Sequence, residues 1–196
     1  MVDSFVSKIL EWLTTKGDIS EDEYELYQYA IICLFSLCAP LFFSILIGHI
    51  LRKEIESILM IIPFICIRKF AGGYHSKKFR NCIIASIIII VSFINIGIII
   101  NYKMVIVFGI ISSLGLLIFS PIDSNNRRLN DIEKKTCKRI VLIFIGVIWI
   151  IVIKLTVWKM DEYAKYMALG IVLSFILQLP IIIRKLFNKS NSSLYT

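Results

Sequence analysis

The sequence predicts an all-α polytopic membrane protein with about six membrane helices and an N-terminal amphipathic helix at the bilayer interface. Its composition is 58% hydrophobic and only 18% charged, with a mean hydropathy of +0.81. A soluble domain averages nearer half apolar and a quarter charged. The apolar residues also gather in long runs, such as the uncharged stretch 83–100. Since roughly 20 apolar residues cross a bilayer as a helix, these runs exclude a soluble globular domain.

The first helix is predicted over residues 2–13. Apolar side chains recur there at helical spacing, while Asp3, Lys8 and Glu11 lie mainly on the other side. This pattern is typical of a helix lying in the membrane interface. A short soluble helix packed on the protein fits the same pattern. No small-residue cleavage site follows, so the segment does not read as a signal peptide.

Six apolar runs follow, at 27–51, 57–67, 83–100, 104–120, 140–157 and 167–183. The second run is short: as a helix it reaches about 16 Å, roughly half the hydrocarbon thickness. It also contains Pro63, which removes a helix hydrogen bond. It is therefore either a re-entrant element or a crossing completed by extra residues and local thinning. We expect residues 1–186 to form one membrane-embedded domain, with 187–196 as a polar C-terminal tail.

Basic residues predict the orientation. The stretch 68–80 holds five Lys and Arg and no acidic residue, and 121–139 holds six, whereas the turn between them carries only Lys103. Lys and Arg collect in cytoplasmic loops, so both stretches are expected inside. If 57–67 crosses, both termini are cytoplasmic; if it is re-entrant, the N-terminus lies outside. We prefer the first arrangement, because it keeps the amphipathic helix beside anionic lipid.

The stretch that carries candidate chemistry places His75 seven residues before Cys82. In one continuous helix the two would lie about 10 Å apart along the axis, too far for proton transfer. Gly72 and Gly73 are a strong turn signal, however, and Asn81 is a good N-cap for a helix beginning at Cys82. We therefore expect His75 on a loop that folds back over the start of that helix.

This placement would activate the Cys82 thiol. Backbone N–H groups and the dipole at a helix start favour negative charge, and Lys77, Lys78 and Arg80 add positive charge nearby. Each effect lowers the pKa of a thiol towards the reactive thiolate. The pattern predicts Cys82 as nucleophile and His75 as general base. The alternative is a plain topology signal, a plain turn and an inert cysteine.

The remaining cysteines indicate no second site. The chain has five, an odd number, scattered without a CxxC pair, which argues against a disulfide framework and a structural zinc site. We expect no metal and no cofactor. A pairing of Cys66 with His49 is weaker, since Cys66 lies in an apolar run and His49 is typical of an interfacial residue near the end of a span. No soluble basic domain is left over to bind nucleic acid, so the net charge of +8 points to topology, membrane lipids or an acidic ligand.

The stretch 68–82 resembles the catalytic region of the accessory gene regulator B (AgrB) family. The pattern consists of Arg68, Gly73, His75 and Cys82, with the family's spacing, in a chain of about the right size and span layout. A second match, Pro121-Ile-Asp-Ser-Asn-Asn-Arg-Arg128, is similar to the segment that opens the family's second hydrophilic loop. It continues with Leu129, where many relatives have proline, so the resemblance does not predict the conformation of this loop; the predicted dyad is unaffected.

The resemblance implies a membrane cysteine endopeptidase of the bacterial cell membrane, with its active site on the cytoplasmic side. Such enzymes process an AgrD-type precursor into a cyclic autoinducing peptide for quorum sensing. By that resemblance Cys82 attacks the precursor with help from His75 and holds the peptide as a thioester. A Cys or Ser of the peptide then closes a thiolactone or lactone. Relatives suggest a homodimer.

Other residues receive supporting roles as hypotheses. Gly72 and Gly73 could hold the oxyanion, with Arg68, or could form a plain turn. Basic residues near the predicted site could attract the acidic tail of the precursor, or could report only topology. These residues are Lys77, Lys78, Arg80, Arg127 and Arg128.

The sequence also allows two hypotheses of a different functional class: a small transporter or permease component, and a non-catalytic membrane partner protein. Against a transporter, the predicted spans hold no acidic residue and almost no charge apart from Lys154 near an end. Ion-coupled transport normally needs an ionisable group within the membrane.

Overall fold

A computed structural model describes residues 10, 12, 14–15, 24–72, 79–122 and 130–184. All regular structure within these ranges is helical, which confirms the predicted all-α class. Of the predicted helix 2–13, only Leu10 and Trp12 are described, and both are helical. The six long helices are α2 (Tyr24–Ile50), α3 (Glu54–Ala71), α4 (Phe79–Ile99), α5 (Tyr102–Phe119), α6 (Asp131–Val157) and α7 (Asp161–Ile176).

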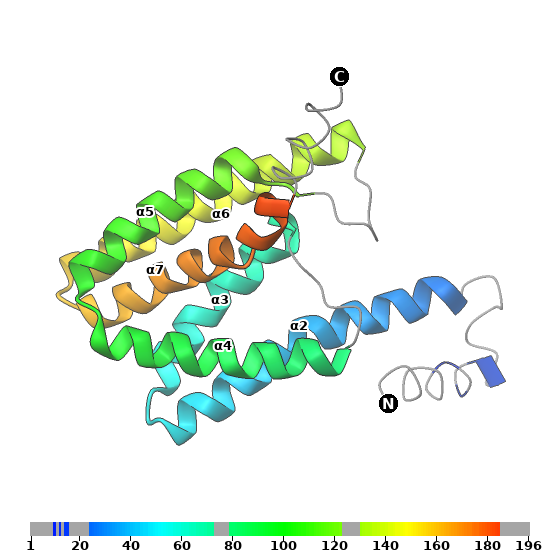
Figure 1. Cartoon of the computed structure of the whole chain (residues 1–196), viewed down its shortest axis with the longest axis horizontal. Helices are drawn as coiled ribbons and strands as arrows, with labels where there is room; N and C mark the ends of the chain where they lie inside the picture. The colour runs from blue at the N-terminus through cyan, green and yellow to red at the C-terminus, as the bar shows by residue number, and fades with distance from the viewer. Residues whose placement is uncertain are drawn as a thin grey trace.

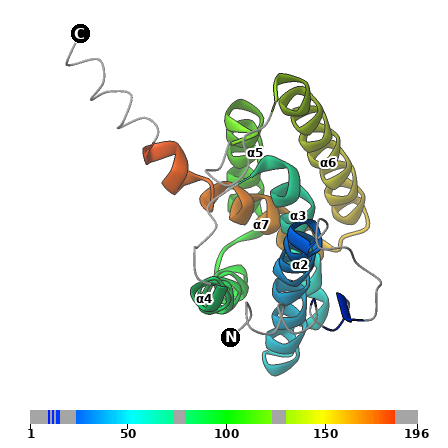
Figure 2. The same cartoon turned by 90° about the vertical axis from the view of Figure 1, so that its right-hand side faces the viewer.

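Successive helices run in opposite directions along the bundle (Figure 1). The short turns 51–53, 100–101 and 158–160 lie together at one end, which we call the tight-turn end. At the other end, α3 and α5 finish and α4 and α6 begin; we call this the loop end. Figure 2, turned by 90°, shows α3 and α7 in the middle, between α5 and α6 on one side and α2 and α4 on the other.

The centre of the bundle is the contact between α3 and α7. Every residue of 164–171 in α7 is buried, as is typical of a helix surrounded by others. Helix α3 buries one face against it, which includes Met60, Ile61, Phe64 and Ile67. Buried residues of α4, α5 and α6 pack around this pair.

The outer helices carry broad apolar faces that no part of the described chain covers. Large side chains on α5 and α6 are exposed, and they include Phe108, Ile111, Leu114, Ile143 and Ile150. Faces of this extent are typical of contact with lipid. Three helices are long and apolar enough to cross a membrane: Tyr102–Phe119, Asp131–Val157 and Asp161–Arg184. The apolar stretches Cys38–Ile50 and Ile84–Ile99 are shorter.

Two helices are longer than their apolar runs predicted. Instead of 57–67, α3 spans Glu54–Ala71, about 27 Å, and Pro63 lies inside it without ending it. The apolar run did not include the ends of α3, because both ends are charged. Acidic residues in its first turn and basic residues in its last turn nevertheless stabilise the helix, since they complement its dipole. Helix α6 begins nine residues before its apolar run, because Asn130 and Glu133 form a capping box. The second half of the basic stretch 121–139 is therefore helical.

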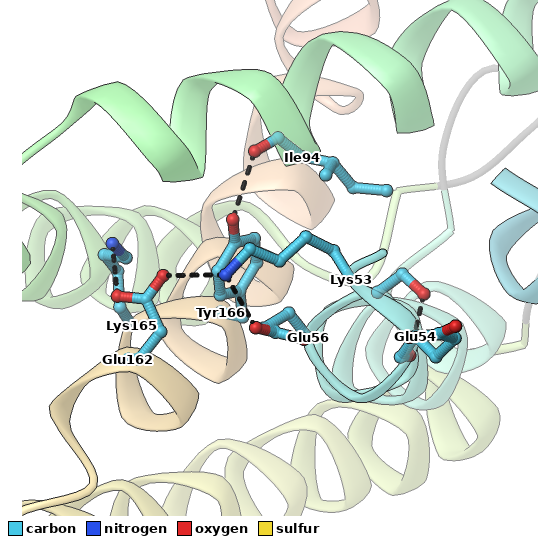
Figure 3. A network of polar contacts seen from close by, with 8 residues as sticks. Lys53, Glu54, Glu56, Ile94, Glu162, Lys165 and Tyr166 are labelled. Atoms are coloured by element: carbon cyan, nitrogen blue, oxygen red, sulfur yellow. Dashed lines mark hydrogen bonds and ion pairs between the residues drawn. The ribbon is translucent and has the colours of Figure 1, made fainter. Parts of the chain in front are cut away.

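Ion pairs fasten α3 to α7 at the tight-turn end (Figure 3). The Nζ atom of Lys53 lies 2.8 Å from Oε1 of Glu56 and 3.6 Å from Oε1 of Glu162. The other oxygen of Glu162 accepts a hydrogen bond of 2.9 Å from Lys165. The hydrogen bond to Glu56 raises the pKa of Lys53 above its usual value. Lys53, Glu56, Glu162 and Lys165 thus pair their charges with one another.

Side-chain hydrogen bonds also join neighbouring helices. The hydroxyl group of Tyr166 in α7 donates to the carbonyl oxygen of Ile94 in α4, at 3.1 Å (Figure 3). Tyr102 of α5 and Thr156 of α6 share a hydrogen bond of 2.6 Å. Farther along the same pair of helices, Trp149 donates to Ser113 at 2.9 Å. Buried polar side chains of this kind are satisfied across helices and so hold the bundle in register.

Candidate functional site

The loop end brings together the starts of the two basic segments that the sequence singled out. Helix α3 ends at Ala71, and the residues after α5 turn back towards it. The backbone N–H group of Ile122 donates to the carbonyl oxygen of Ala71 at 3.0 Å. Gly72 and Ile122, the last described residues before segments 73–78 and 123–129, therefore lie close to each other.

Several predicted site residues fall outside the described residues. Segment 73–78 contains Gly73, His75, Lys77 and Lys78, and segment 123–129 contains Arg127 and Arg128. The contact between His75 and Cys82, and the precursor-binding role of the basic residues, therefore stay predictions.

Cys82 and Arg80 lie in α4, where the backbone is described and their side chains are not. Helix α4 already includes Phe79, so Cys82 is its fourth described residue rather than its first. Asn81 lies inside the helix and is not its N-cap, contrary to the expectation from the sequence. Activation of the Cys82 thiol by the start of α4 therefore stays a prediction.

Gly72 ends α3 in a conformation that suits only glycine. Its φ is +74° and its ψ is −174°, a region that other residues enter at a cost of about 1–3 kcal/mol. Its N–H group donates to the carbonyl oxygen of Arg68 at 3.2 Å. That amide is therefore occupied in closing the helix. This favours the turn role for Gly72 and leaves the oxyanion role to Gly73 as a prediction.

Arg68 occupies the last turn of α3, close to this glycine. Its guanidinium carbon lies 5.6 Å from the centre of the Phe64 ring, within the range of a cation–π contact. A positive charge in the last turn also complements the helix dipole. The side chain is partly buried and so takes part in the packing of the loop end. Its role in stabilising an oxyanion stays a prediction.

The weaker pairing of His49 with Cys66 is not made. The Nδ1 atom of His49 lies 3.1 Å from Oε1 of Glu54, at the tight-turn end, and the side chain is 80% exposed. Cys66 lies in the second half of α3, towards the loop end. Cys38, Cys66 and Cys137 are free thiols.

The side chain that joins the helix ends at the loop end belongs to a residue that no sequence motif indicated. Gln178, just after α7, is fully buried, and its Nε2 atom donates to the carbonyl oxygen of Ala71 at 2.9 Å and to Oγ of Ser120 at 3.0 Å. One signal was available: Gln178 is a carboxamide inside the apolar run 167–183. A polar group in such a run is costly unless it is bonded, which marks it for a specific role.

Gly72→Ala tests the local strain at the end of α3. A Cβ atom at this position would lie 2.5 Å from the carbonyl oxygen of Ile122, besides forcing the unfavourable φ. We expect a loss of about 1–3 kcal/mol of stability, seen as a lower melting temperature of the purified protein in detergent. Gly146→Ala is the control, since a Cβ there meets nothing within 4 Å. Equal melting temperatures for the two variants would contradict this account.

Comparison with known proteins gives one family. The model of that family, described as accessory gene regulator B, matches residues 6–182. The chain is similar to AgrB-like protein 1 of Clostridium perfringens strain 13, with 33% identity over 46% of this chain and 48% of the relative. It is also similar to AgrB-like protein 2 of that strain, with 24% identity over 69% of this chain and 67% of the relative. No solved structure matches the chain.

Proposed function

This chain belongs to the accessory gene regulator B family, and on that premise we propose that it is a cysteine endopeptidase of a bacterial cell membrane. Its substrate is an AgrD-type precursor peptide, from which it removes the acidic C-terminal part. The enzyme also supports closure of the remaining peptide into a thiolactone or lactone, which serves as an autoinducing signal in quorum sensing. Cys82 is the nucleophile and His75 the general base.

The proposed reaction has two exchanges at one sulfur atom. The thiolate of Cys82 attacks the carbonyl carbon at the cleavage site, and the C–N bond breaks. The leaving amine takes the proton that His75 received from the thiol, and the peptide stays on Cys82 as a thioester. A Cys or Ser of the peptide then attacks the thioester carbonyl and gives its proton to His75. The C–S bond to Cys82 breaks, which closes the ring and returns the Cys82 thiolate. Because the second exchange replaces a thioester by another thioester or by an ester, it needs no further activation.

The observation that supports this chemistry is the break between α3 and α4. A helix running unbroken through residues 68–82 would hold the imidazole and the thiol about 10 Å apart. The chain instead leaves helical conformation at Gly72, with φ of +74°, and is helical again at Phe79. Cys82 follows within the first turn of the new helix. An end of α3 before residue 75 is what a folded-back His75 requires.

For the topology we propose six crossings with both termini in the cytoplasm. The alternating directions of α2 to α7 and the 27 Å length of α3 support a crossing in place of a re-entrant element. Both basic segments leave the loop end, so the positive-inside rule assigns that end, and with it the proposed active site, to the cytoplasm.

Substrate binding is proposed to use charge. The acidic tail of the precursor would meet basic residues on the two segments that leave the loop end, and the amphipathic helix 2–13 would gather the precursor at the same interface. A homodimer is part of this proposal by family resemblance. The proposed precursor-binding residues are Lys77, Lys78, Arg80, Arg127 and Arg128.

A variant that keeps only Cys82 tests the assignment directly. Replacing Cys33, Cys38, Cys66 and Cys137 with Ala should leave at least about half of the cleavage of a co-expressed AgrD-type precursor, because none of these thiols takes part. Mass spectrometry of this variant should find the peptide attached to Cys82, in a form that hydroxylamine removes. Loss of cleavage together with absence of the adduct, in a variant that melts like the wild type, would refute the proposal.

A further inference from the structure

The carboxamide of Gln178 occupies a special place in the bundle. Helix α7 is interrupted after Ile176, because Pro180 has no N–H group to continue the hydrogen-bond pattern and its ring crowds the preceding turn; the chain is helical again over 179–184. The two residues after Ile176 form a turn, in which the N–H group of Gln178 bonds to the carbonyl oxygen of Phe175 at 2.9 Å. The side chain is thereby directed into the interior, where none of it is exposed.

Inside the bundle this side chain bonds to two other segments. It donates to the carbonyl oxygen of Ala71 at 2.9 Å, with a longer contact of 3.5 Å to that of Gly72. It also bonds to Oγ of Ser120, the residue that ends α5, at 3.0 Å. Ser120 itself is 4% exposed. One buried amide therefore joins the ends of α3, α5 and α7.

The energetics make this junction specific. The last carbonyl groups of a helix have no partner within the helix, and an unsatisfied polar group in an apolar interior costs several kcal/mol. The carbonyl oxygen of Ala71 receives both the amide of Gln178 and the backbone N–H group of Ile122. The carboxamide of Gln178 therefore fastens the end of α3 to Ser120 at the end of α5 and satisfies a carbonyl group that α3 leaves without a helical partner.

We propose that Gln178 is a positioning residue for the reaction at Cys82. This inference rests on the proposed function. The side chain of Gln178 holds the end of α3 at Ala71 and Gly72, three residues before His75, and the end of α5 at Ser120. Gln178 itself touches no reacting atom; it acts by setting the starting point of the segment that carries the general base.

The expected effect is on the chemical step. A displacement of about 1 Å in a catalytic group can lower a rate by roughly 100-fold. Gln178→Met keeps the length of the side chain and removes both donors, so kcat should fall by about 10- to 100-fold while KM changes less than about 3-fold. Ser120→Ala removes only the link to α5 and should lower kcat by about 3-fold.

Ser174→Ala is the matched control. Ser174 is buried in α7, one turn before Gln178, and among the described residues its hydroxyl group bonds to the carbonyl oxygen of Gly170 within the same helix. Its loss removes a buried hydrogen bond of similar strength without freeing the end of α3. We expect cleavage within about 2-fold of the wild type.

The deciding measurement is the rate of alkylation of Cys82 against pH, in membranes, with the other four cysteines replaced. A general base held near the thiol should increase the thiolate fraction at neutral pH, so Gln178→Met should slow alkylation by about 10-fold, as His75→Ala does. In the H75A background, Gln178→Met should slow it no further, because the residue through which it acts is gone. If Gln178→Met does not accumulate, Ser120→Ala is measured in the same two backgrounds, with a smaller shift.

The outcomes separate this inference from the proposed function. If Gln178→Met behaves like Ser174→Ala while Cys82→Ala and His75→Ala abolish cleavage, the function stands and the positioning role is wrong. If Gln178→Met slows alkylation equally with and without His75, the residue acts only on the fold and the inference is likewise wrong. If Cys82→Ala and His75→Ala both still cleave the precursor, the proposed function itself fails.

Discussion

Precursor cleavage should fall by about 10³-fold or more in Cys82→Ala, and by about 10²- to 10⁴-fold in His75→Ala. The first change removes the only atom that forms a bond with the substrate in the proposed reaction. The second removes the group that takes the thiol proton and returns it to the leaving amine. The measurement is the trimming of a co-expressed AgrD-type precursor, followed by mass spectrometry in membranes with matched amounts of enzyme.

Combining the two changes should cost little more than Cys82→Ala alone, because residues that act as a unit are not additive. His49→Ala and Cys137→Ala are the matched controls. His49 is exposed and bonds to Glu54 at the tight-turn end, and Cys137 is a free thiol in α6. Both control variants should cleave the precursor as fast as the wild type. Persistent trimming in either Cys82→Ala or His75→Ala would remove that residue from the mechanism.

Gly170→Ala should destabilise the whole bundle. A Cβ atom on Gly170 would overlap the carbonyl oxygen of Met60 and meet Cβ of Pro63 at 3.0 Å, so α3 and α7 would have to move apart. Overpacking of this kind costs about 1–3 kcal/mol, and here a backbone atom rather than a flexible side chain must yield. The larger side chain of Gly170→Leu should cost about 3 kcal/mol of stability or more. Thermal unfolding in detergent measures both.

The same separation of α3 from α7 should reach the loop end, since Gln178 lies two turns beyond Gly170 and bonds to the end of α3. Cleavage should therefore fall together with the melting temperature. Gly146→Ala in α6 is again the control, because a Cβ there meets nothing within 4 Å. It should be neutral or stabilise the helix by up to about 1 kcal/mol. If Gly170→Ala melts like this control, the close approach of the two helices does not stabilise the protein.

Much of the architecture was predictable from local patterns. Apolar runs located all six long helices, because burial in lipid or protein requires contiguous apolar residues. The predicted ends were less accurate where charge intervened. The apolar run 57–67 missed the charged turns of α3, and 140–157 missed the capped start of α6. In both cases the helix continues because its terminal charges suit the dipole, a feature that hydropathy does not register.

The candidate site was less predictable from the sequence than the helices were. The turn at Gly72 followed from its residue type, and the structure shows the positive φ that only glycine accepts readily. Asn81 did not become an N-cap, since α4 begins earlier than the apolar run suggested. His75 and its distance from Cys82 stay predictions, on which the cleavage experiments bear directly.

The sequence by itself determined the class of the protein and its family, because hydropathy, charge and the spacing of Arg68, Gly73, His75 and Cys82 are all local properties. Only the tertiary structure decided which segments meet. Gln178 bonds to a carbonyl oxygen 107 residues away and to a hydroxyl group 58 residues away. No periodicity along the chain encodes such partners, since they depend on how α3, α5 and α7 pack and on which buried polar groups must be satisfied at their ends.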